Sequence, residues 1–296
     1  MSSEGLGVLI TPSAAGTGWR EALTARAVSL GWAVHDGASE PPGVGLVFAH
    51  DHAGLLAFPP SARAVVRDTT ATANLDPGQP AVLDEIILRS TILAEAELAA
   101  TQGAAVFNAA RYVLDFPILG TIERRDDGPY RIHPSVSESP LAIFDDLEPG
   151  SQANWHPRWF VYVGGYEGSI DEPQIDMTGR MRAFLHGPYI RLPAGRWRVD
   201  VHFTVDPQRA HAPLLFEWGS GIEFSRIMTE INYPGSYAVS LDRVWQEADA
   251  AQLRIWNAHP VFQGRFGFQG ARVTRVAMDD PTPPTPTDRI VEASVG

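Results

Sequence analysis

The sequence contains no cysteine and no lysine, and each absence removes a class of chemistry. Without cysteine, disulfides, thiolate catalysis and cysteine-ligated metal sites are excluded. All 23 basic residues are arginine, so Schiff-base catalysis by lysine and phosphate sites that depend on a P-loop lysine are excluded as well. A GC-rich genome, which favours arginine codons, explains the missing lysine.

Positive charge and long apolar runs are also scarce. The formal net charge is −12, whereas a nucleic-acid partner requires a basic surface. No stretch reaches the roughly 18 apolar residues of a membrane-spanning helix, and the first residues lack the basic start and apolar centre of a secretion signal. We therefore expect a cytoplasmic protein with no nucleic-acid partner and no membrane insertion.

Strand and helix patterns alternate in the first third of the chain. Trp19–Leu30 has the periodicity of an amphipathic helix, Pro80–Thr101 predicts a longer helix, and Ala104–Leu114 predicts a second one after Gly103. Four short apolar runs predict buried strands, at Leu6–Thr11, Trp32–His35, Val44–His50 and Ala64–Arg67. Residues 1–119 are thus predicted to form a small α/β unit, Rossmann-like or flavodoxin-like, that ends in a helix or a helix pair.

The pattern changes after this unit. Residues 120–140 are polar and contain prolines, which predicts a connector. Beyond them, short alternating runs such as Arg196–Val205 are separated by Gly, Pro and Asp turns, which predicts an antiparallel β-sandwich of jelly-roll type over residues 141–279. Residues 280–296 are rich in proline and threonine and predict a flexible tail. The expected fold class is α+β multidomain.

Two segments of this second part resemble a known class of module. The run Gly187–Val201, GPYIRLPAGRWRVDV, resembles a recurrent hairpin of bacterial jelly-roll modules of the carbohydrate-binding type. The pairing of Leu253–Trp256 with a closing strand at Gly270–Val276 is similar to the same modules. The resemblance covers the last half of the chain and implies a saccharide ligand and a link to glycosyltransferase and surface-polysaccharide systems. It transfers no binding residue, because the aromatic positions differ among such modules.

One short motif has the form of a metal site. His50-Asp51-His52 follows a predicted strand, and two histidines at a strand end can ligate a metal in hydrolases. No further cluster of histidines or carboxylates follows nearby, so a surface turn is the favoured interpretation, and we expect that no metal is needed for folding.

The loop after the first predicted strand occupies the place where phosphates bind in doubly wound folds. This loop, Thr11–Gly18, lacks the G-x-G-x-x-G pattern, so a tight structural connection is the favoured interpretation. Asp36, at the end of the second strand, has the place of a ribose ligand, although a solvated turn residue is the favoured interpretation. We therefore expect no cofactor.

Aromatic and cationic residues in the second half suggest a ligand surface. Sugars stack on flat aromatic rings, and Arg or His can bond their hydroxyl groups. The candidates for ligand binding are Trp155, His156, Arg158, Trp159, Trp218 and Trp256. The competing interpretation is that tryptophan in a sandwich belongs to the core. We place Trp197 in the core because it alternates with Val199 and Val201, and we place Trp155 on the surface because no such alternation surrounds it.

These patterns favour a non-catalytic, carbohydrate-linked binding or accessory protein. In this hypothesis the sandwich binds a saccharide, and the α/β unit provides docking to a protein partner or a second copy of the chain. Two alternatives stay open: a glycan-modifying enzyme with a site between the two units, which would use His50, Asp51 and His52, and a purely structural or assembly role.

Overall fold

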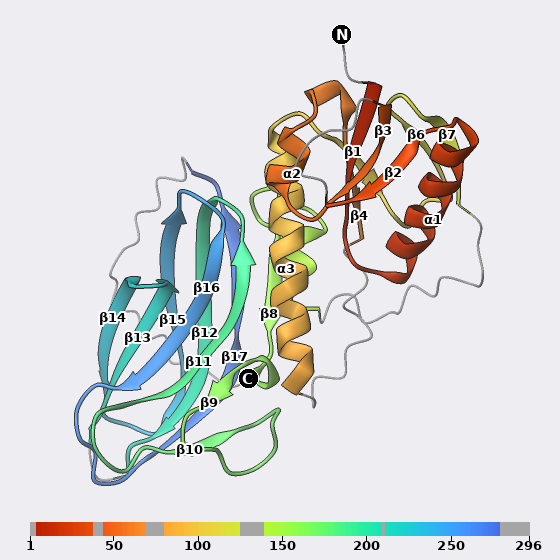
Figure 1. Cartoon of the computed structure of the whole chain (residues 1–296). Coiled ribbons are helices and arrows are strands. Elements are labelled where there is room, and N and C mark those ends of the chain that lie inside the picture. Colours follow the sequence, from red (N-terminus) through yellow and green to blue (C-terminus); the bar gives the residue numbers. More distant parts are fainter. Residues whose placement is uncertain (1–3, 38–43, 69–79, 125–138, 209–210, 279–296) are drawn as a thin grey trace. The chain divides into compact units, whose positions relative to one another are not determined.

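The computed structural model describes residues 4–37, 44–68, 80–124, 139–208 and 211–278 (Figure 1). The chain divides into two compact units, Met1–Asn74 with Leu88–Pro134 and Leu75–Ile87 with Ser135–Gly296. Most of the predicted connector, 120–140, and the predicted tail, 280–296, lie outside the described residues, so both remain predictions.

The α/β unit is built on a parallel five-stranded sheet. The strand order is β2 (Ala33–Asp36), β3 (Val44–Ala49), β1 (Glu4–Ile10), β4 (Arg63–Arg67) and β5 (Ala105–Asn108). The α/β class is as predicted. The order differs from both predicted templates, in which the second strand lies beside the first, because here β3 lies between β1 and β2.

The first helix begins at Ala14, so its predicted start at Trp19 is wrong and the predicted loop Thr11–Gly18 ends at Ser13, whereas the long helix begins at Pro80 and ends at Thr101 as predicted. Helix α1 (Ala14–Ser29) begins after Ser13, whose side-chain oxygen accepts a hydrogen bond from the Gly16 N–H at 2.8 Å. It is followed by Gly31 at a φ of +72°, a backbone conformation that glycine adopts without strain. The buried face of α1 includes Trp19, whose indole N–H donates to the Ala109 carbonyl at 3.0 Å. The predicted long helix is α3 (Pro80–Thr101), of which the part from Leu88 onward belongs to this unit, and a short α2 (His52–Leu56) follows β3.

The second helix predicted over Ala104–Leu114 is wrong. Gly103 ends α3 at a φ of +88°, and the following residues form β5 and a hairpin of β6 (Val113–Phe116) and β7 (Gly120–Glu123). Leu114 and Phe116 are buried and alternate with exposed Val113 and Asp115. This two-residue alternation fits a half-buried hairpin and not a helical face.

The second unit is an antiparallel β-sandwich, as predicted. One sheet, here called the β12 sheet, has the order β10 (Gln174–Asp176), β17 (Arg265–Val276), β12 (Gly195–Asp206) and β15 (Gly235–Trp245), with β8 (Gln152–Trp155) also paired to β17. The other, the β16 sheet, has the order β14 (Glu223–Ile231), β13 (Ala212–Ser220), β16 (Asp249–Asn257), β11 (Arg182–Leu192) and β9 (Val161–Tyr162). Strands β8, β10 and β14 are too short or too polar to show an apolar repeat, and the sequence analysis missed them.

Aromatic side chains from both sheets fill the space between them. Phe203 of β12 and Phe216 of β13 have ring centroids 5.0 Å apart, and Phe203 stacks on Phe266 of β17 at 5.4 Å. Trp197 is fully buried, as predicted, and its indole N–H donates to the Pro193 carbonyl at 2.9 Å. The alternation along β12 therefore directs its apolar face into the core.

The surface position predicted for Trp155 is wrong. Its side chain is 0% exposed, its indole N–H donates to the Pro140 carbonyl at 3.1 Å, and its ring lies 5.6 Å from that of Trp218. Trp155 lies on β8, which pairs with β17 at the margin of the β12 sheet and covers the core there. The strand consists of only four residues, so its alternation was too brief to detect.

We expect both Trp155→Ala and Trp197→Ala to destabilise the sandwich strongly. Removing a buried tryptophan typically costs about 3–5 kcal/mol of unfolding free energy because of the cavity and the lost apolar burial. Tyr233→Ala serves as the control, since this side chain is 73% exposed and its loss should change stability by less than about 0.5 kcal/mol. Urea unfolding of the three variants measures the difference, and a parent-like midpoint for Trp155→Ala would contradict the core position of this ring.

Candidate functional site

The solvent face of the β16 sheet carries a cluster of aromatic and cationic side chains. Leu214, Phe216 and Trp218 of β13 point into the core, so Leu215 and Glu217 between them point outward. On β16, Leu253 and Ile255 are buried, which turns Arg254 and Trp256 to the outer face. The register of β14, β13, β16 and β11 aligns these outward residues in two rows across the sheet: Met228, Leu215, Trp256 and Ala183, then Arg226, Glu217, Arg254 and His186.

Glu217 is the centre of this face. Its carboxylate is 6% exposed although it points away from the core, because three neighbouring side chains cover it. Its Oε1 accepts from the Arg226 Nε at 2.7 Å, and its Oε2 accepts from the Trp256 indole N–H at 2.9 Å. Arg254 Nη1 lies 3.9 Å from Oε2. The carboxylate therefore fixes the edge of the partly exposed Trp256 ring and holds two guanidinium groups beside it.

A second aromatic ring extends the face. The Arg254 guanidinium lies over the Phe224 ring, 4.2 Å from its centroid, and its Nε donates to Gln252 Oε1 at 2.9 Å. The backbone at Gly219 permits this arrangement, since a Cβ there would lie 2.0 Å from the Glu223 carbonyl oxygen and 2.9 Å from the Phe224 ring. Both contacts limit the freedom of Arg254, which leaves it preorganised beside Trp256.

A histidine and a tyrosine occupy the other side of Arg254. A β-bulge in β11 between Pro188 and Ile190 sets Tyr189 at a φ of +66°, and its hydroxyl lies 2.6 Å from His186 Nδ1. Burial lowers the pKa of His186, and the positive charge of Arg254 lowers it further. Burial raises the pKa of the Tyr189 hydroxyl, so it stays protonated, and in the tautomer with a bare Nδ1 it is the donor to the imidazole.

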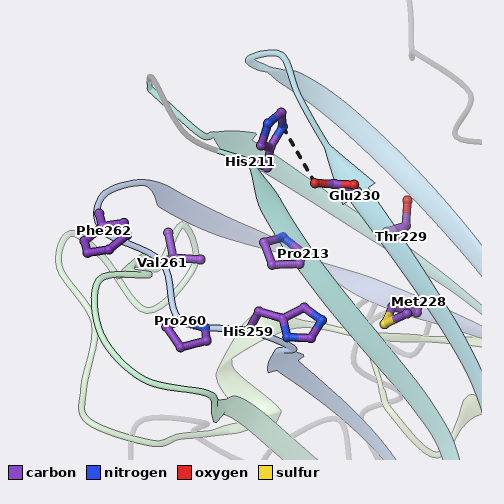
Figure 2. Close-up of a pocket in the computed structure, with 9 residues that line it drawn as sticks. All are labelled: His211, Pro213, Met228, Thr229, Glu230, His259, Pro260, Val261 and Phe262. Carbon is purple, nitrogen blue, oxygen red and sulfur yellow. Dashed lines mark ion pairs between the residues drawn. The ribbon is translucent and has the colours of Figure 1, made fainter.

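A hollow of about 730 Å³ lies at one end of the same face (Figure 2). Pro213 and Met228 form its floor, and Met228 belongs to the row that contains Trp256. The segment from His259 to Phe262 forms one wall, and Glu230 with His211, whose Nδ1 lies 3.7 Å from Glu230 Oε1, forms the other. Phe262 is 90% exposed. The hollow therefore continues the aromatic face toward the sheet edge.

The structure does not bring the six predicted ligand-binding residues together. Trp155, Trp159 and Trp218 are buried and present no ring face to a surface ligand. His156 and Arg158 lie on the side of the β12 sheet, where Arg158 Nη2 pairs with Asp171 at 2.6 Å. Trp256 alone lies on the outer face of the β16 sheet, so it is the predicted residue that the geometry favours; saccharide binding by His156 and Arg158 is untested.

The two histidines of the predicted metal motif have different partners. His50 Nε2 lies 2.9 Å from Asp36 Oδ1, and His52 Nε2 lies 2.9 Å from Gln102 Oε1. Asp51 between them accepts from the Gly54 N–H at 2.8 Å and is the N-cap of α2. The described parts of the chain contain no group of three histidine, cysteine or carboxylate side chains that could hold a metal ion. A helix cap accounts for this motif.

The position of Asp36 in the sheet does not fit the ribose-binding role considered for it. Because β3 separates β2 from β1, Asp36 is not beside the loop that follows β1. Its carboxylate is paired with Arg20 at 2.6 Å and with His50, and these two hydrogen bonds lower the pKa of Asp36. Asp36 is thus a paired residue at the sheet edge.

Sequence reasoning missed most of the aromatic face, yet one signal for it was present. In Leu214–Trp218 and Leu253–Trp256, the spacing between the tryptophan and its apolar neighbours is either even, which places them on the same face of the strand, or odd, which places them on opposite faces. Trp218 shares the parity of Leu214 and Phe216 and is core, whereas Trp256 has the parity opposite to Leu253 and Ile255 and is outside. His186, Tyr189 and Phe224 offered no comparable signal, because a bulge and a polar edge strand place them.

Several solved carbohydrate-binding modules are similar to part of this chain, at low identity and low TM-score. The xylan-binding CBM22-1 domain of Paenibacillus barcinonensis Xyn10C matches 44% of this chain and 97% of its own at 10% identity and a TM-score of 0.33. TmCBM61, solved with β-1,4-galactotriose, matches 39% of this chain and 80% of its own at 11% identity and a TM-score of 0.28. The C-terminal CBM6 of LamC, a laminarinase from Zobellia galactanivorans, matches 42% and 99% at 12% identity and a TM-score of 0.29.

No protein-family model matches the sequence, and no curated protein matches it significantly. No helix within the described residues is long and apolar enough to cross a membrane. The C-terminal part of the chain is a β-sandwich by its own sheet topology, and the solved structures similar to it are carbohydrate-binding modules at low identity.

Proposed function

We propose that the outer face of the β16 sheet binds a saccharide without chemically changing it. The observation that carries the proposal is the state of Trp256, a partly exposed ring on a solvent face. Its N–H is bonded to Glu217 at 2.9 Å, so the polar edge of the indole is satisfied within the protein. The apolar ring surface is left to a ligand, and the C–H face of a pyranose is a suitable partner for a flat aromatic ring.

The polar groups around Trp256 suit a ligand with many hydroxyl groups. Arg226, with a side chain 59% exposed, and Arg254, 29% exposed, present guanidinium donors in fixed positions. His186 is neutral and, with Nδ1 accepting from Tyr189, carries its ring proton on Nε2. A few placed polar groups around an aromatic surface are the usual composition of a small-molecule site.

The state of Glu217 favours binding over hydrolysis. Glycosidases need two carboxyl groups that face the sugar, one of them able to donate a proton. Both oxygens of Glu217 instead accept hydrogen bonds, from Arg226 and Trp256, and no free oxygen faces solvent at this 6% exposed group. Glu217 is therefore a positioning residue for the ring and the guanidinium groups.

The wider role that we propose is that of a cytoplasmic accessory protein in bacterial surface-polysaccharide synthesis. The support is the resemblance of Gly187–Val201 to a hairpin of modules found with such systems. Deleting the gene and measuring surface polysaccharide, together with cell fractionation, tests this role separately from saccharide binding.

We expect Trp256→Ala to lower saccharide affinity about tenfold or more while the sandwich stays folded. The loss corresponds to about 1.4 kcal/mol of binding free energy, within the usual range for one stacked ring. A glycan array identifies ligands for the parent protein, and calorimetry then compares the parent with Trp256→Ala. Tyr233→Ala is the matched control, an exposed aromatic residue outside this face. Equal affinities of the parent and Trp256→Ala would contradict the proposal, as would an array without a ligand.

We also expect both stability and binding to weaken in acid because of His186. Its pKa in the folded protein lies below its unfolded value of about 6.5, so its stabilising contribution is present above about pH 6.5 and is lost as the pH falls through the folded pKa. Protonation also adds a cation beside Arg254. The test is urea unfolding and calorimetry between pH 4.5 and 8, a range of about two units around the unfolded pKa. The fall of stability and of saccharide affinity toward acid pH should be smaller in His186→Gln than in the parent. Parallel profiles of parent and variant would contradict this assignment.

A further inference from the structure

The α/β unit contains a buried arginine, Arg124, which lies against Gly18 in the first turns of α1 and whose Nε and Nη2 have no hydrogen-bond partner among the described residues. We propose that this place is an oxyanion site for a ligand that carries a phosphate group, independent of the saccharide face. The site is formed by the loop between β1 and α1, the first turns of α1 and the side chain of Arg124, which follows β7.

The loop after β1 is folded closely onto the first turn of the helix. A Cβ on Gly16 would lie 2.4 Å from the Thr11 carbonyl oxygen and 3.2 Å from Ser13 Oγ, so this position requires glycine. The Ser13 side chain accepts from the Gly16 N–H, and the Ser13 carbonyl accepts from the Thr17 N–H. These two amides are therefore bonded within the loop, and what the helix start offers to an anion is the positive end of the helix dipole.

Arg124 is directed to this end of the helix by β7. At the start of β7, the Leu119 carbonyl accepts from Arg26 Nε, in the last turn of α1, at 3.2 Å. The strand then runs antiparallel to the helix, so that Arg124 reaches Gly18. A Cβ on Gly18 would lie 3.0 Å from Arg124 Cδ and 3.7 Å from Nη1. The absence of a side chain at Gly18 is what allows the arginine to lie against the first turns.

The guanidinium group of Arg124 is both buried and incompletely bonded. The residue is 6% exposed, and its Nε and Nη2 are buried with no hydrogen-bond partner among the described residues. Its Cζ lies 5.0 Å from the centroid of the Tyr112 ring, a contact that offsets only part of the desolvation of a cation. Two unsatisfied donors of a forked cation beside a helix N-terminus fit the oxygens of a phosphate group.

Arg63 shows that burial of an arginine in this unit does not by itself leave donors unpaired. Arg63 is 9% exposed, yet its Nε donates to the Phe58 carbonyl at 2.7 Å and its Nη1 and Nη2 donate to the Gln102 and Leu56 carbonyls at 3.4 and 3.5 Å. The fold therefore satisfies this structural arginine with main-chain oxygens. Nε and Nη2 of Arg124 lack such partners. An external anion that accepts from both would satisfy them.

The test uses the full chain with inorganic pyrophosphate and inorganic phosphate at constant ionic strength. We expect pyrophosphate to raise the melting temperature of the parent protein and to bind in calorimetry. Arg124→Met keeps the length of the side chain and removes the charge. It should melt at or above the parent temperature without ligand, because an unpaired buried cation is removed, and its Kd for pyrophosphate should rise at least tenfold.

Arg63→Met is the matched control. It should melt below the parent because it leaves three main-chain carbonyls without their donors, yet keep the parent Kd for pyrophosphate. If Arg124→Met does not fold, Arg124→Lys is measured in its place. A Kd for pyrophosphate severalfold above that of the parent supports the site, and an unchanged Kd overturns it. The proposal is also overturned if the parent binds neither anion, if Arg124→Met binds like the parent, or if Arg63→Met loses binding to the same extent.

Discussion

The register between β13 and β16 is the constraint on which the outer face of the β16 sheet, the proposed saccharide site, depends. Side chains alternate between the two faces of a strand, so a shift by one residue would exchange the core set for the surface set. With Glu217 opposite Arg254 and Leu215 opposite Trp256, the core receives Phe216 and Trp218. The outer face consequently receives a carboxylate, an arginine and an indole within contact of one another.

Glu217 shows how a sheet surface can become preorganised without a deep cavity. Arg226 and Trp256 cover it, so an outward-facing carboxylate has the burial of a core residue. Removing it would leave the indole N–H and a guanidinium group without their acceptor, which costs more than the loss of an exposed ion pair. The ring position of Trp256 therefore depends on a residue that is itself not available to the ligand.

Buried arginines of this chain differ in how their donors are satisfied. In the sandwich, Arg196 and Arg198 both bond Asp242, whose side chain is 6% exposed, so buried positive charge is matched by a carboxylate within the unit. In the α/β unit, Arg63 is satisfied by carbonyl oxygens, whereas Arg124 retains two unpaired donors. The proposed saccharide face and the proposed oxyanion site thus rest on separate features, and each can be removed without the other.

The sequence by itself determined the fold class, the long helices and the core position of Trp197, because these depend on periodicity over ten or more residues. Parity within β13 and β16 also separates Trp218 from Trp256. Only the tertiary structure determined the contacts between residues that are distant in the sequence. The four-residue β8 buries Trp155 through its pairing with β17, the crossing of β3 moves Asp36 away from β1, and β7 brings Arg124 to α1 across more than 100 residues of chain. These contacts are made between residues distant in sequence, and no local repeat records them.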